Sequence, residues 1–249
     1  MALMSRLKYQ VRKTAMDLRD MAIGPHYRIE GAKLRLPRGG NPSIKSALLG
    51  DRYERDEREM IKTFMSPALP VIELGGSYGV VSFTIRRCLM PDQRLVVVEA
   101  NPAIVPICRA NVTLAGAEDK TTVVQAALAY GGTKVRFKVS DNVHTSGLVF
   151  DGSTGPDIVD VPSVALQSLR DAYGITSPYT LVCDIEGAEL LMLRHDAQAL
   201  ADCSLIIMET HPYVYPDMGG TLDEVLGHLA RMGFAIFNKR ANVIAVRRG

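Results

Sequence analysis

The stretch that most constrains this chain runs from Val71 to Gly79 and reads V-I-E-L-G-G-S-Y-G. A short apolar run contains the acidic Glu73, a turn follows at Gly75, and an amphipathic pattern begins after Gly79. This order predicts a buried strand, a tight turn and a helix. Gly75 lets the backbone approach a ligand, and the free N–H groups at a helix start favour an anionic group. We therefore expect a nucleotide-binding loop.

The glycine spacing narrows the kind of nucleotide that this loop binds. The loop reads E-x-G-x-x-x-G, whereas the dinucleotide fingerprint is G-x-G-x-x-G. A looser nucleoside-binding loop fits the spacing better. An NAD-dependent oxidoreductase is the less favoured alternative.

Strands and helices alternate after this loop. Apolar runs predict strands at 94–99, 121–125, 179–184 and 203–209. Helical patterns separate them at 102–115, 163–172 and 221–231. This alternation predicts an α/β fold with a parallel sheet. Residues 134–161 are rich in glycine and predict an antiparallel or irregular excursion over the pocket, while 234–237 and 243–246 predict a closing β-hairpin.

Residues 1–66 predict an N-terminal appendage of helices and a short hairpin, and residues 67–249 the main domain. The appendage carries 14 Lys/Arg against 8 Asp/Glu, so it is basic, whereas the remainder is acidic. The mixed charges at 52–59 predict a helix with a solvated face.

The first helix of the appendage is basic and amphipathic, because apolar residues recur at helical spacing. These are Leu3, Leu7, Val11, Leu18 and Met21. Asp17 and Asp20 dilute the charge, and aromatic residues are not interleaved. We therefore expect the stripe to pack on the domain or on a second subunit, in a homo-oligomer, in preference to a membrane or nucleic acid.

Composition excludes several classes of protein. The chain is 47% hydrophobic and 22% charged, as ordinary globular proteins are. No apolar run approaches the roughly 18 residues of a transmembrane segment, and no signal-peptide core is present, so we expect a cytoplasmic protein. The four cysteines include no C-x-x-C pair, which predicts reduced, buried side chains.

Acidic residues end the predicted strands. Glu73, Glu99, Asp184 and Glu209 stand at these positions. In a parallel sheet they share one carboxyl edge, where ligands bind. Glu99 lies 26 residues after Glu73, close to the interval of about 20 at which an acid meets a ribose hydroxyl. Asn101 follows in a turn that suits the ribose, or it caps the next helix.

Four blocks together resemble the FkbM family of S-adenosylmethionine-dependent methyltransferases. They are E-L-G-G-S-Y-G at 73–79, V-V-E-A-N-P at 97–102, V-C-D-I-E-G-A-E at 182–189 and I-I-M-E-T-H-P at 206–212. The resemblance covers residues 50–249, and the D-I-E-G-A-E block is its most specific part. The chain departs from the family pattern at Glu73, Gly76 and Ser77, where D-x-G-A-N-x-G is usual, and at Val182, where the family usually has lysine.

This resemblance implies a class I methyltransferase fold, which is Rossmann-like, with a seven-stranded, mostly parallel sheet and a closing antiparallel hairpin. It also implies O-methylation of a small molecule or of a glycosyl or macrolide-type metabolite. We expect S-adenosylmethionine to bind at Glu73, Gly75, Gly76, Ser77 and Gly79, with Glu99 and Asn101 at the ribose and Ala126 and Ala127 at the adenine.

The expected acceptor is a small hydroxylated molecule in a pocket roofed by His144, Thr145 and Ser146. Nucleic acid is not expected, because no Asn/Asp-Pro-Pro-aromatic loop follows the fourth strand and the chain has no Trp. A non-catalytic binding protein on the same fold is the alternative from another class.

Asp184, Glu186, Glu209 and His211 are the candidate catalytic groups. A sugar-type hydroxyl needs a base or a metal ion before it attacks a methyl group. His211 suits the base because its unperturbed pKa lies near 6.5, with Asp184 as the orienting or metal-binding group. Alternatively, Asp184 and Glu209 hold a hard ion such as Mg²⁺. A purely structural interpretation also stands for Glu186 and Glu189, which would stabilise the start of the helix at Gly187.

Overall fold

The computed structural model describes residues 2–140, 146–150, 152–175 and 178–248. Within them, seven strands form one sheet in the order β12-β13-β11-β10-β3-β4-β5. Five of these strands are parallel: β3 (Val71–Leu74), β4 (Leu95–Glu99), β5 (Thr121–Gln125), β10 (Tyr179–Cys183) and β11 (Cys203–Glu209). β12 (Phe234–Arg240) and β13 (Val243–Arg248) form the antiparallel hairpin that closes the sheet beside β11. The predicted fold class is confirmed.

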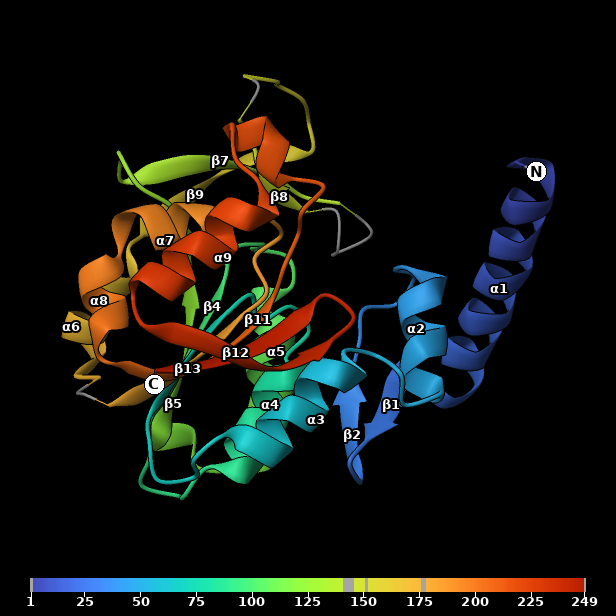
Figure 1. Ribbon diagram of the computed structural model, residues 1–249. Helices are drawn as coiled ribbons and strands as arrows, with labels where there is room; N and C mark the ends of the chain where they lie inside the picture. Colours follow the sequence, from blue (N-terminus) through green and yellow to red (C-terminus); the bar gives the residue numbers. More distant parts are fainter. Residues whose placement is uncertain (1, 141–145, 151, 176–177, 249) are drawn as a thin grey trace.

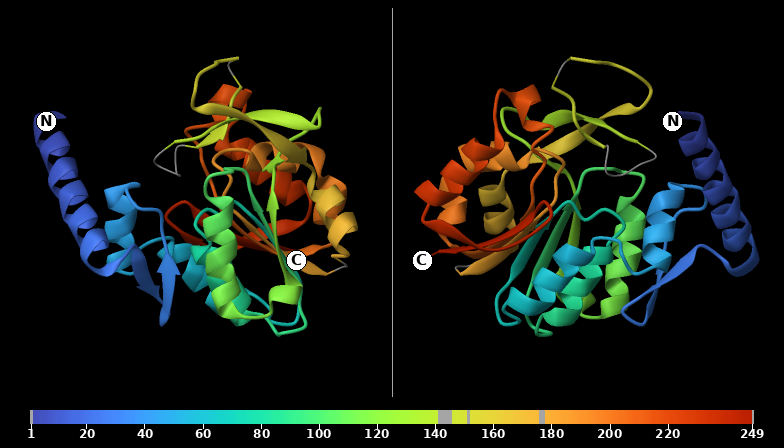
Figure 2. Two further views of the ribbon diagram at one scale, coloured as in Figure 1. Left: turned by 180° about the vertical axis from the view of Figure 1, so that it is seen from behind. Right: turned by 45° about the vertical axis from the view of Figure 1, so that its right-hand side comes forward.

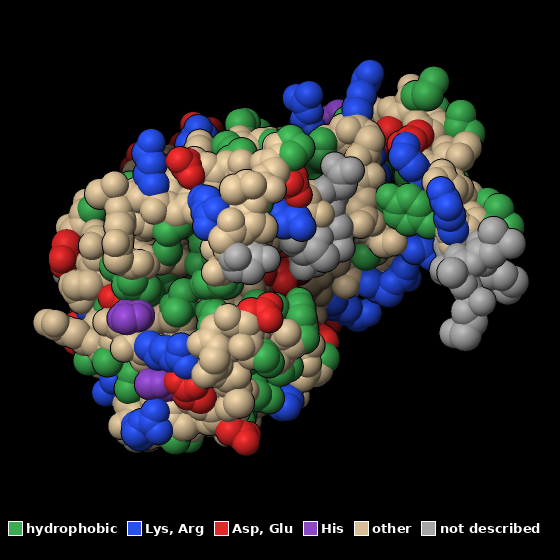
Figure 3. All heavy atoms as spheres, turned by 90° about the horizontal axis from the view of Figure 1, so that it is seen from above, with side chains coloured by type: hydrophobic (Ala, Val, Ile, Leu, Met, Phe, Trp, Pro, Cys, Tyr) green, Lys and Arg blue, Asp and Glu red, His purple; other side chains and the backbone are tan. Residues whose placement is uncertain are grey.

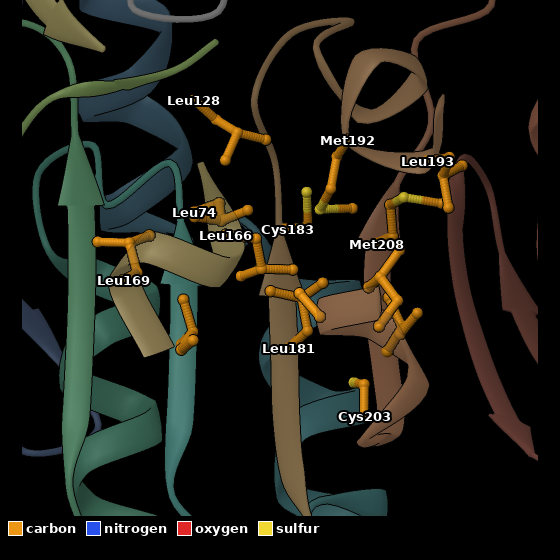
Figure 4. Close-up of a cluster of buried hydrophobic side chains, with 14 of the residues drawn as sticks. Leu74, Leu128, Leu166, Leu169, Leu181, Cys183, Met192, Leu193, Cys203 and Met208 are labelled. Atoms are coloured by element: carbon orange, nitrogen blue, oxygen red, sulfur yellow. The ribbon is translucent and has the colours of Figure 1, made fainter. Parts of the chain in front are cut away.

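Alternating side chains of the strands bury apolar cores on both faces of the sheet. Ile72 and Leu74 face a core formed with α6 (Leu166–Tyr173), α7 (Glu189–His195), α8 (Ala197–Ala201) and α9 (Leu222–Arg231). Figure 4 shows part of this core, with leucine, methionine and cysteine side chains meeting between sheet and helices. Val71 faces the second core, formed with α3 (Arg55–Phe64), α4 (Val80–Cys88) and α5 (Val105–Val112). The result is a three-layer sandwich (Figure 1).

A second, smaller sheet covers the carboxyl edge of the main sheet (Figure 1). Its strands run in the order β6 (Ala127–Leu128), β9 (Ile158–Val164), β7 (Lys134–Lys138) and β8 (Gly147–Leu148). β7 pairs antiparallel with β8 and β9, which confirms the predicted excursion. The helix expected from residue 163 begins only at Leu166, because Ser163 still pairs with Ala127 in the small sheet.

Two other helices differ from their predicted bounds or surroundings. The helix expected from Pro102 begins at Val105, because the Asn101 side chain accepts a hydrogen bond from Ala103 N and forms a turn first. Short 3₁₀ helices follow at Thr113–Ala115 and Glu118–Lys120, and another lies at Tyr215–Met218. α3 has the predicted solvated face, on which Arg55 and Lys62 are exposed, but its Glu57 and Arg58 are buried.

Most of the predicted N-terminal appendage belongs to the main body. The hairpin of β1 (His26–Ile29) and β2 (Ala32–Arg35) and helix α2 (Pro42–Leu49) share an apolar cluster with Tyr78, Val80 and Phe83. Met60 and Ile61 of α3 enter the core that contains Val71. The boundary at residue 66 therefore runs through two continuous cores.

Only α1 (Ala2–Ile23) stands away from the body, with α2 between them (Figures 1 and 2). The expectation that its stripe packs on the domain is wrong, because Leu7, Val11, Leu18 and Met21 are exposed. No helix among the described residues is long and apolar enough to cross a membrane. The four cysteines are free; Cys88 is half-buried and the other three are buried.

Candidate active site

The turn after β3 brings the glycine loop to the carboxyl edge of the sheet. Gly75 and Gly79 have φ angles of +94° and +76°, which side chains rarely adopt. A Cβ on Gly75 would lie 1.7 Å from the carbonyl oxygen of Asp184, and a Cβ on Gly79 would lie 2.8 Å from that of Cys108. Glycine at these positions therefore lets the loop pack against the end of β10 and α4 against α5.

A pocket of about 700 Å³, its open mouth included, lies beside this loop. It extends over the ends of β3, β4, β5 and β10, since the residues that follow these strands line it. Six of the expected cofactor residues are on its wall, namely Gly75, Ser77, Glu99, Asn101, Ala126 and Ala127. Leu128, Phe137 and Leu148 add an apolar side.

Glu73, Gly76 and Gly79 do not line the pocket, although the sequence suggested them as cofactor residues. Glu73 alternates with Leu74 along β3, so its side chain faces the α3–α4 side of the sheet. A Cβ on Gly76 would lie 2.4 Å from Val97 Cγ1, which makes this glycine a packing position. These three residues support the loop from behind.

Glu99 joins the glycine loop to the turn after β4. Its carboxylate accepts hydrogen bonds from Ser77 N at 2.7 Å and Asn101 N at 2.6 Å. Burial raises the pKa of Glu99, and these backbone hydrogen bonds partly offset the shift. The carboxylate oxygens keep further lone pairs for a ligand hydroxyl in the pocket.

The start of α3 also reaches the pocket, which sequence reasoning missed. Glu54 lines the pocket, and burial raises its pKa to about 8. The hydroxyl of the neighbouring Tyr53 lies 3.1 Å from Ser77 Oγ and links α3 to the loop. The only sequence feature that could have indicated this contact was Tyr53, just before the helix. The charged residues around it indicated a solvent-exposed segment instead.

His211 is surrounded by carboxylates from the loop after β10. Its Nδ1 lies 3.0 Å from Glu189 Oε1. Its Nε2 lies 3.4 Å from Asp184 Oδ1 and 3.5 Å from Glu186 Oε2. Glu189 is fully buried and also accepts hydrogen bonds from Ile185 N, Gly187 N and the Tyr215 hydroxyl. Glu189 therefore stabilises the helix start and also fixes the orientation of the imidazole. Sequence reasoning did not assign the second role to it.

The electrostatics of this cluster change the assignment of the base. Burial would lower the pKa of His211, but its hydrogen bond with Glu189 and the charges of Asp184 and Glu186 raise it to about 9. This shift away from the unperturbed value near 6.5 favours the protonated imidazole at neutral pH and disfavours His211 as the base. Burial raises the pKa of Glu186 to about 7, although His211 and Tyr213 oppose that shift.

Asp184 has one enclosed carboxylate oxygen that faces His211. Burial and the charge of Glu209 raise its pKa, while His211 opposes the shift. Its Oδ1 makes no well-aligned hydrogen bond to any described residue, and it lies 3.4 Å from Nε2 of His211, with which it forms an ion pair when the imidazole is protonated.

The group that could hold a metal ion differs from the predicted pair. Asp184, Glu186 and His211 have ligand atoms that all lie within 4.8 Å of one another. Glu209 is not in this group, since it continues the side of β11 on which Leu205 and Ile207 face α3. An imidazole ligand suits Mn²⁺ or Zn²⁺ better than Mg²⁺, which prefers oxygen. The donor set therefore does not fit Mg²⁺ well.

A wider groove adjoins the pocket and shares Ser146, Leu148 and Glu186 with it. Its empty volume is about 1230 Å³, open solvent included. Lys138, Phe150, Tyr213 and Asp217 are among its other walls. The Tyr213 hydroxyl donates a hydrogen bond of 3.1 Å to Glu186 Oε2. Of the predicted roof, Ser146 lines both spaces, while His144 and Thr145 lie outside the described residues.

The family model for the methyltransferase FkbM domain matches residues 73–236 of this sequence. Two solved structures of similar fold are an O-methyltransferase from Bacillus cereus and a precorrin-6y C5,15-methyltransferase from Geobacter metallireducens. The first is 14% identical to this chain and has a TM-score of 0.43, and the match covers 78% of this chain and 79% of the other chain. The second is also 14% identical and has a TM-score of 0.46, covering 79% and 88%. A comparison with curated proteins gave no match.

Proposed function

Because the chain belongs to the FkbM methyltransferase family, we propose that it transfers the methyl group of S-adenosylmethionine to a hydroxyl oxygen. The proposed acceptor is a small molecule or a glycosyl or macrolide-type metabolite, and not nucleic acid. The observation that carries this proposal is that Glu186 lines both the pocket and the adjoining groove. One carboxylate is thus available where a cofactor and an acceptor meet.

The residues of the pocket fit S-adenosylmethionine. Ala126 and Ala127 offer a flat apolar wall for an adenine, and the Glu99 carboxylate can accept from ribose hydroxyls. Glu54 and Asp184 place carboxyl oxygens at one end of the pocket, where they can accept hydrogen bonds from the cofactor's ammonium group. When bound, S-adenosylmethionine supplies an electrophilic methyl group.

The groove is the proposed acceptor site. Glu186, which the Tyr213 hydroxyl orients, accepts the proton of the acceptor hydroxyl while that oxygen forms its bond to the methyl carbon and the carbon–sulfur bond breaks. Its pKa of about 7 suits a base at neutral pH. Protonated His211, held by Glu189, keeps Asp184 and Glu186 in place. Alignment of the two substrates supplies much of the remaining acceleration.

The same three side chains support a metal-assisted variant of this function. In it, Asp184, Glu186 and His211 hold a divalent ion, with His211 neutral and its Nδ1 hydrogen donated to Glu189. The ion would polarise the acceptor hydroxyl. Turnover that resists dialysis against a chelator contradicts this variant and leaves Glu186 as the base.

The experiment combines labelled S-adenosylmethionine with extracts separated into metabolites, glycans and nucleic acid. We expect label in the metabolite or glycan fraction, and a loss of roughly 100-fold or more in kcat for Glu186→Gln with little change in cofactor affinity. A matched control is Glu118→Gln, which changes an exposed acid far from the pocket.

Other outcomes would point to different functions. Label in nucleic acid alone would contradict the acceptor class. S-adenosylmethionine binding without transfer to any fraction would favour the non-catalytic binding protein. Tight NADH binding by calorimetry, with no S-adenosylmethionine binding, would favour the oxidoreductase.

A further inference from the structure

Helix α1 turns its apolar stripe away from the rest of the chain. Leu7, Val11 and Leu18 recur at the spacing that places side chains on one helix face. They are 65%, 63% and 59% exposed, and Met21 near the end of the helix is 77% exposed. Figure 3 shows hydrophobic side chains along the outer edge of the end that carries α1, with Lys and Arg side chains beside them. Contiguous exposed apolar surface of this kind marks an interaction site.

The opposite face of α1 is fastened to the body by polar contacts. Asp20 is buried and accepts hydrogen bonds from Lys45 Nζ at 2.5 Å and from the Tyr27 hydroxyl at 2.9 Å. Arg19 donates to the carbonyl oxygen of His26, and Arg12 donates to Ser43 Oγ at 3.1 Å. These contacts fix the rotation of the helix. The stripe therefore faces outward as a consequence of the fold.

Basic residues lie on both sides of the stripe. At 100° per residue, Lys8 falls on one flank and Arg6 on the other, while Arg12, Lys13 and Arg19 lie further from the stripe and contact Ser43, Asp17 and His26. Asp17 pairs with Lys13, and Asp20 pairs with Lys45 and Arg19, so the basic residues of the helix without an acidic partner among the described residues are Arg6, Lys8 and Arg12. An apolar stripe between cationic flanks has the pattern of helices that lie in the surface of an anionic bilayer.

We propose that α1 binds the surface of an anionic membrane, with its stripe among the acyl chains and its flanks on the lipid headgroups. Charge disfavours a second copy of this chain, because two such stripes packed together would bring basic flanks against basic flanks. A bilayer also fits the position of α1 at the edge of the molecule, with α2 between it and the body (Figure 2).

The test uses the full chain and vesicles of defined composition. We expect the protein to co-sediment with vesicles that contain about one third phosphatidylglycerol, and to stay in solution with pure phosphatidylcholine. Binding should fall at least ten-fold between about 50 mM and 500 mM salt, because salt screens the basic flanks. Equal binding to both lipids, or none to either, would contradict this role of α1.

Variants of exposed residues separate the stripe from the rest of the surface. Leu7→Gln with Val11→Gln should reduce vesicle binding ten-fold or more, and so should Lys8→Glu with Arg6→Glu. Leu114→Gln is the matched control, because Leu114 is 54% exposed on another part of the molecule and should bind as the unchanged chain does. Unchanged circular dichroism verifies the fold of each variant.

Light scattering tests whether a second copy of the chain covers the stripe instead of a membrane. A chain that is a dimer in solution, and that becomes a monomer in the Leu7→Gln, Val11→Gln variant without any change in vesicle binding, would assign the stripe to a second copy and overturn the membrane proposal. A monomeric chain whose vesicle binding is lost in that variant supports it.

Discussion

At the scale of single residues, Glu189 determines the charge of the candidate active site. A carboxylate accepts hydrogen bonds, so His211 donates its Nδ1 hydrogen to it and its Nε2 faces Asp184 and Glu186. The sequence identified His211, Asp184 and Glu186 as candidate catalytic residues, but it did not show which carboxylate each imidazole nitrogen faces. Sequence spacing gave no distance between Glu189 and His211, so the carboxylate that raises the pKa of His211 could not be recognised.

The pH dependence of turnover follows from this arrangement. Glu186 must be ionised to act as the base, so kcat should rise as the pH passes about 7. His211 loses its proton near pH 9, after which Asp184 and Glu186 lack their counter-charge, so kcat should fall. Glu189→Gln removes the carboxylate that raises the pKa of His211, and should move this upper limb to lower pH. A flat profile between pH 6 and 10 would rule out both assignments.

Glu73 should make the protein less stable as the pH rises. The residue is buried, neither carboxylate oxygen makes a well-aligned hydrogen bond to a described residue, and burial raises its pKa to about 8, with Ser82 opposing the shift. Between pH 4.5 and 8 the folded state keeps a proton that the unfolded chain has released, so the free energy of unfolding falls by up to about 1.4 kcal/mol per pH unit.

Glu73→Gln removes this titration. We compare the free energy of unfolding of Glu73→Gln with that of the unchanged chain, as measured by urea unfolding. The difference should shift in favour of the variant by about 2 to 4 kcal/mol between pH 5 and pH 8. The fixed cost of burying the amide cancels in that comparison between pH values. Glu118→Gln, an exposed site, should track the unchanged chain. Parallel stability curves for Glu73→Gln and the unchanged chain would show that Glu73 is ionised in the folded protein.

At the scale of elements, strands were predicted better than helix surroundings. The runs that became β3, β4, β10 and β11 are buried on both faces, so mostly apolar residues marked them directly. α3 and α1 also have amphipathic patterns, but the sequence does not show which part of the protein contacts each face. α3 buries the side chains of Glu57 and Arg58, whereas α1 exposes its apolar stripe. Periodicity shows that a helix has two faces, but tertiary packing decides which face is covered.

Two tyrosines from different elements should separate cofactor binding from acceptor binding. Tyr53→Phe at the start of α3 removes the hydroxyl that contacts Ser77 in the glycine loop, and should weaken S-adenosylmethionine binding by roughly 2- to 10-fold. Tyr213→Phe, between β11 and α9, removes the hydrogen bond to Glu186, and should change kcat and the acceptor KM while cofactor affinity stays the same. Calorimetry and initial rates measure the two effects. Equal losses of cofactor affinity in both variants would contradict the division into pocket and groove.

At the scale of the whole molecule, strand order places the site. β3 and β10 are neighbours in the sheet although a long stretch of chain separates them, so the glycine loop and Asp184 meet at one edge. Alternation of strands and helices predicted this edge. It did not predict that α3 and the β1–β2 hairpin complete the cores, because contacts between distant segments leave no local pattern.

The predicted domain boundary at residue 66 can be tested with truncated chains. A fragment of residues 67–249 loses buried side chains of α3 and the hairpin, including Tyr27, Leu34, Met60 and Ile61. At about 1.5 to 3 kcal/mol for each large apolar side chain, the loss approaches the whole stability of a typical domain. We expect this fragment to show no cooperative thermal transition by circular dichroism.

Residues 17–249 are the matched control for that fragment. This piece keeps Asp20 and its contacts with Lys45 and Tyr27, and it lacks only the part of α1 that projects from the body. It should unfold cooperatively within a few degrees of the full chain, because few buried groups are removed. A 67–249 fragment with the Tm of the full chain would instead make residues 1–66 an independent appendage. Loss of folding in both fragments would show that the projecting part of α1 stabilises the body, which its exposed stripe does not predict.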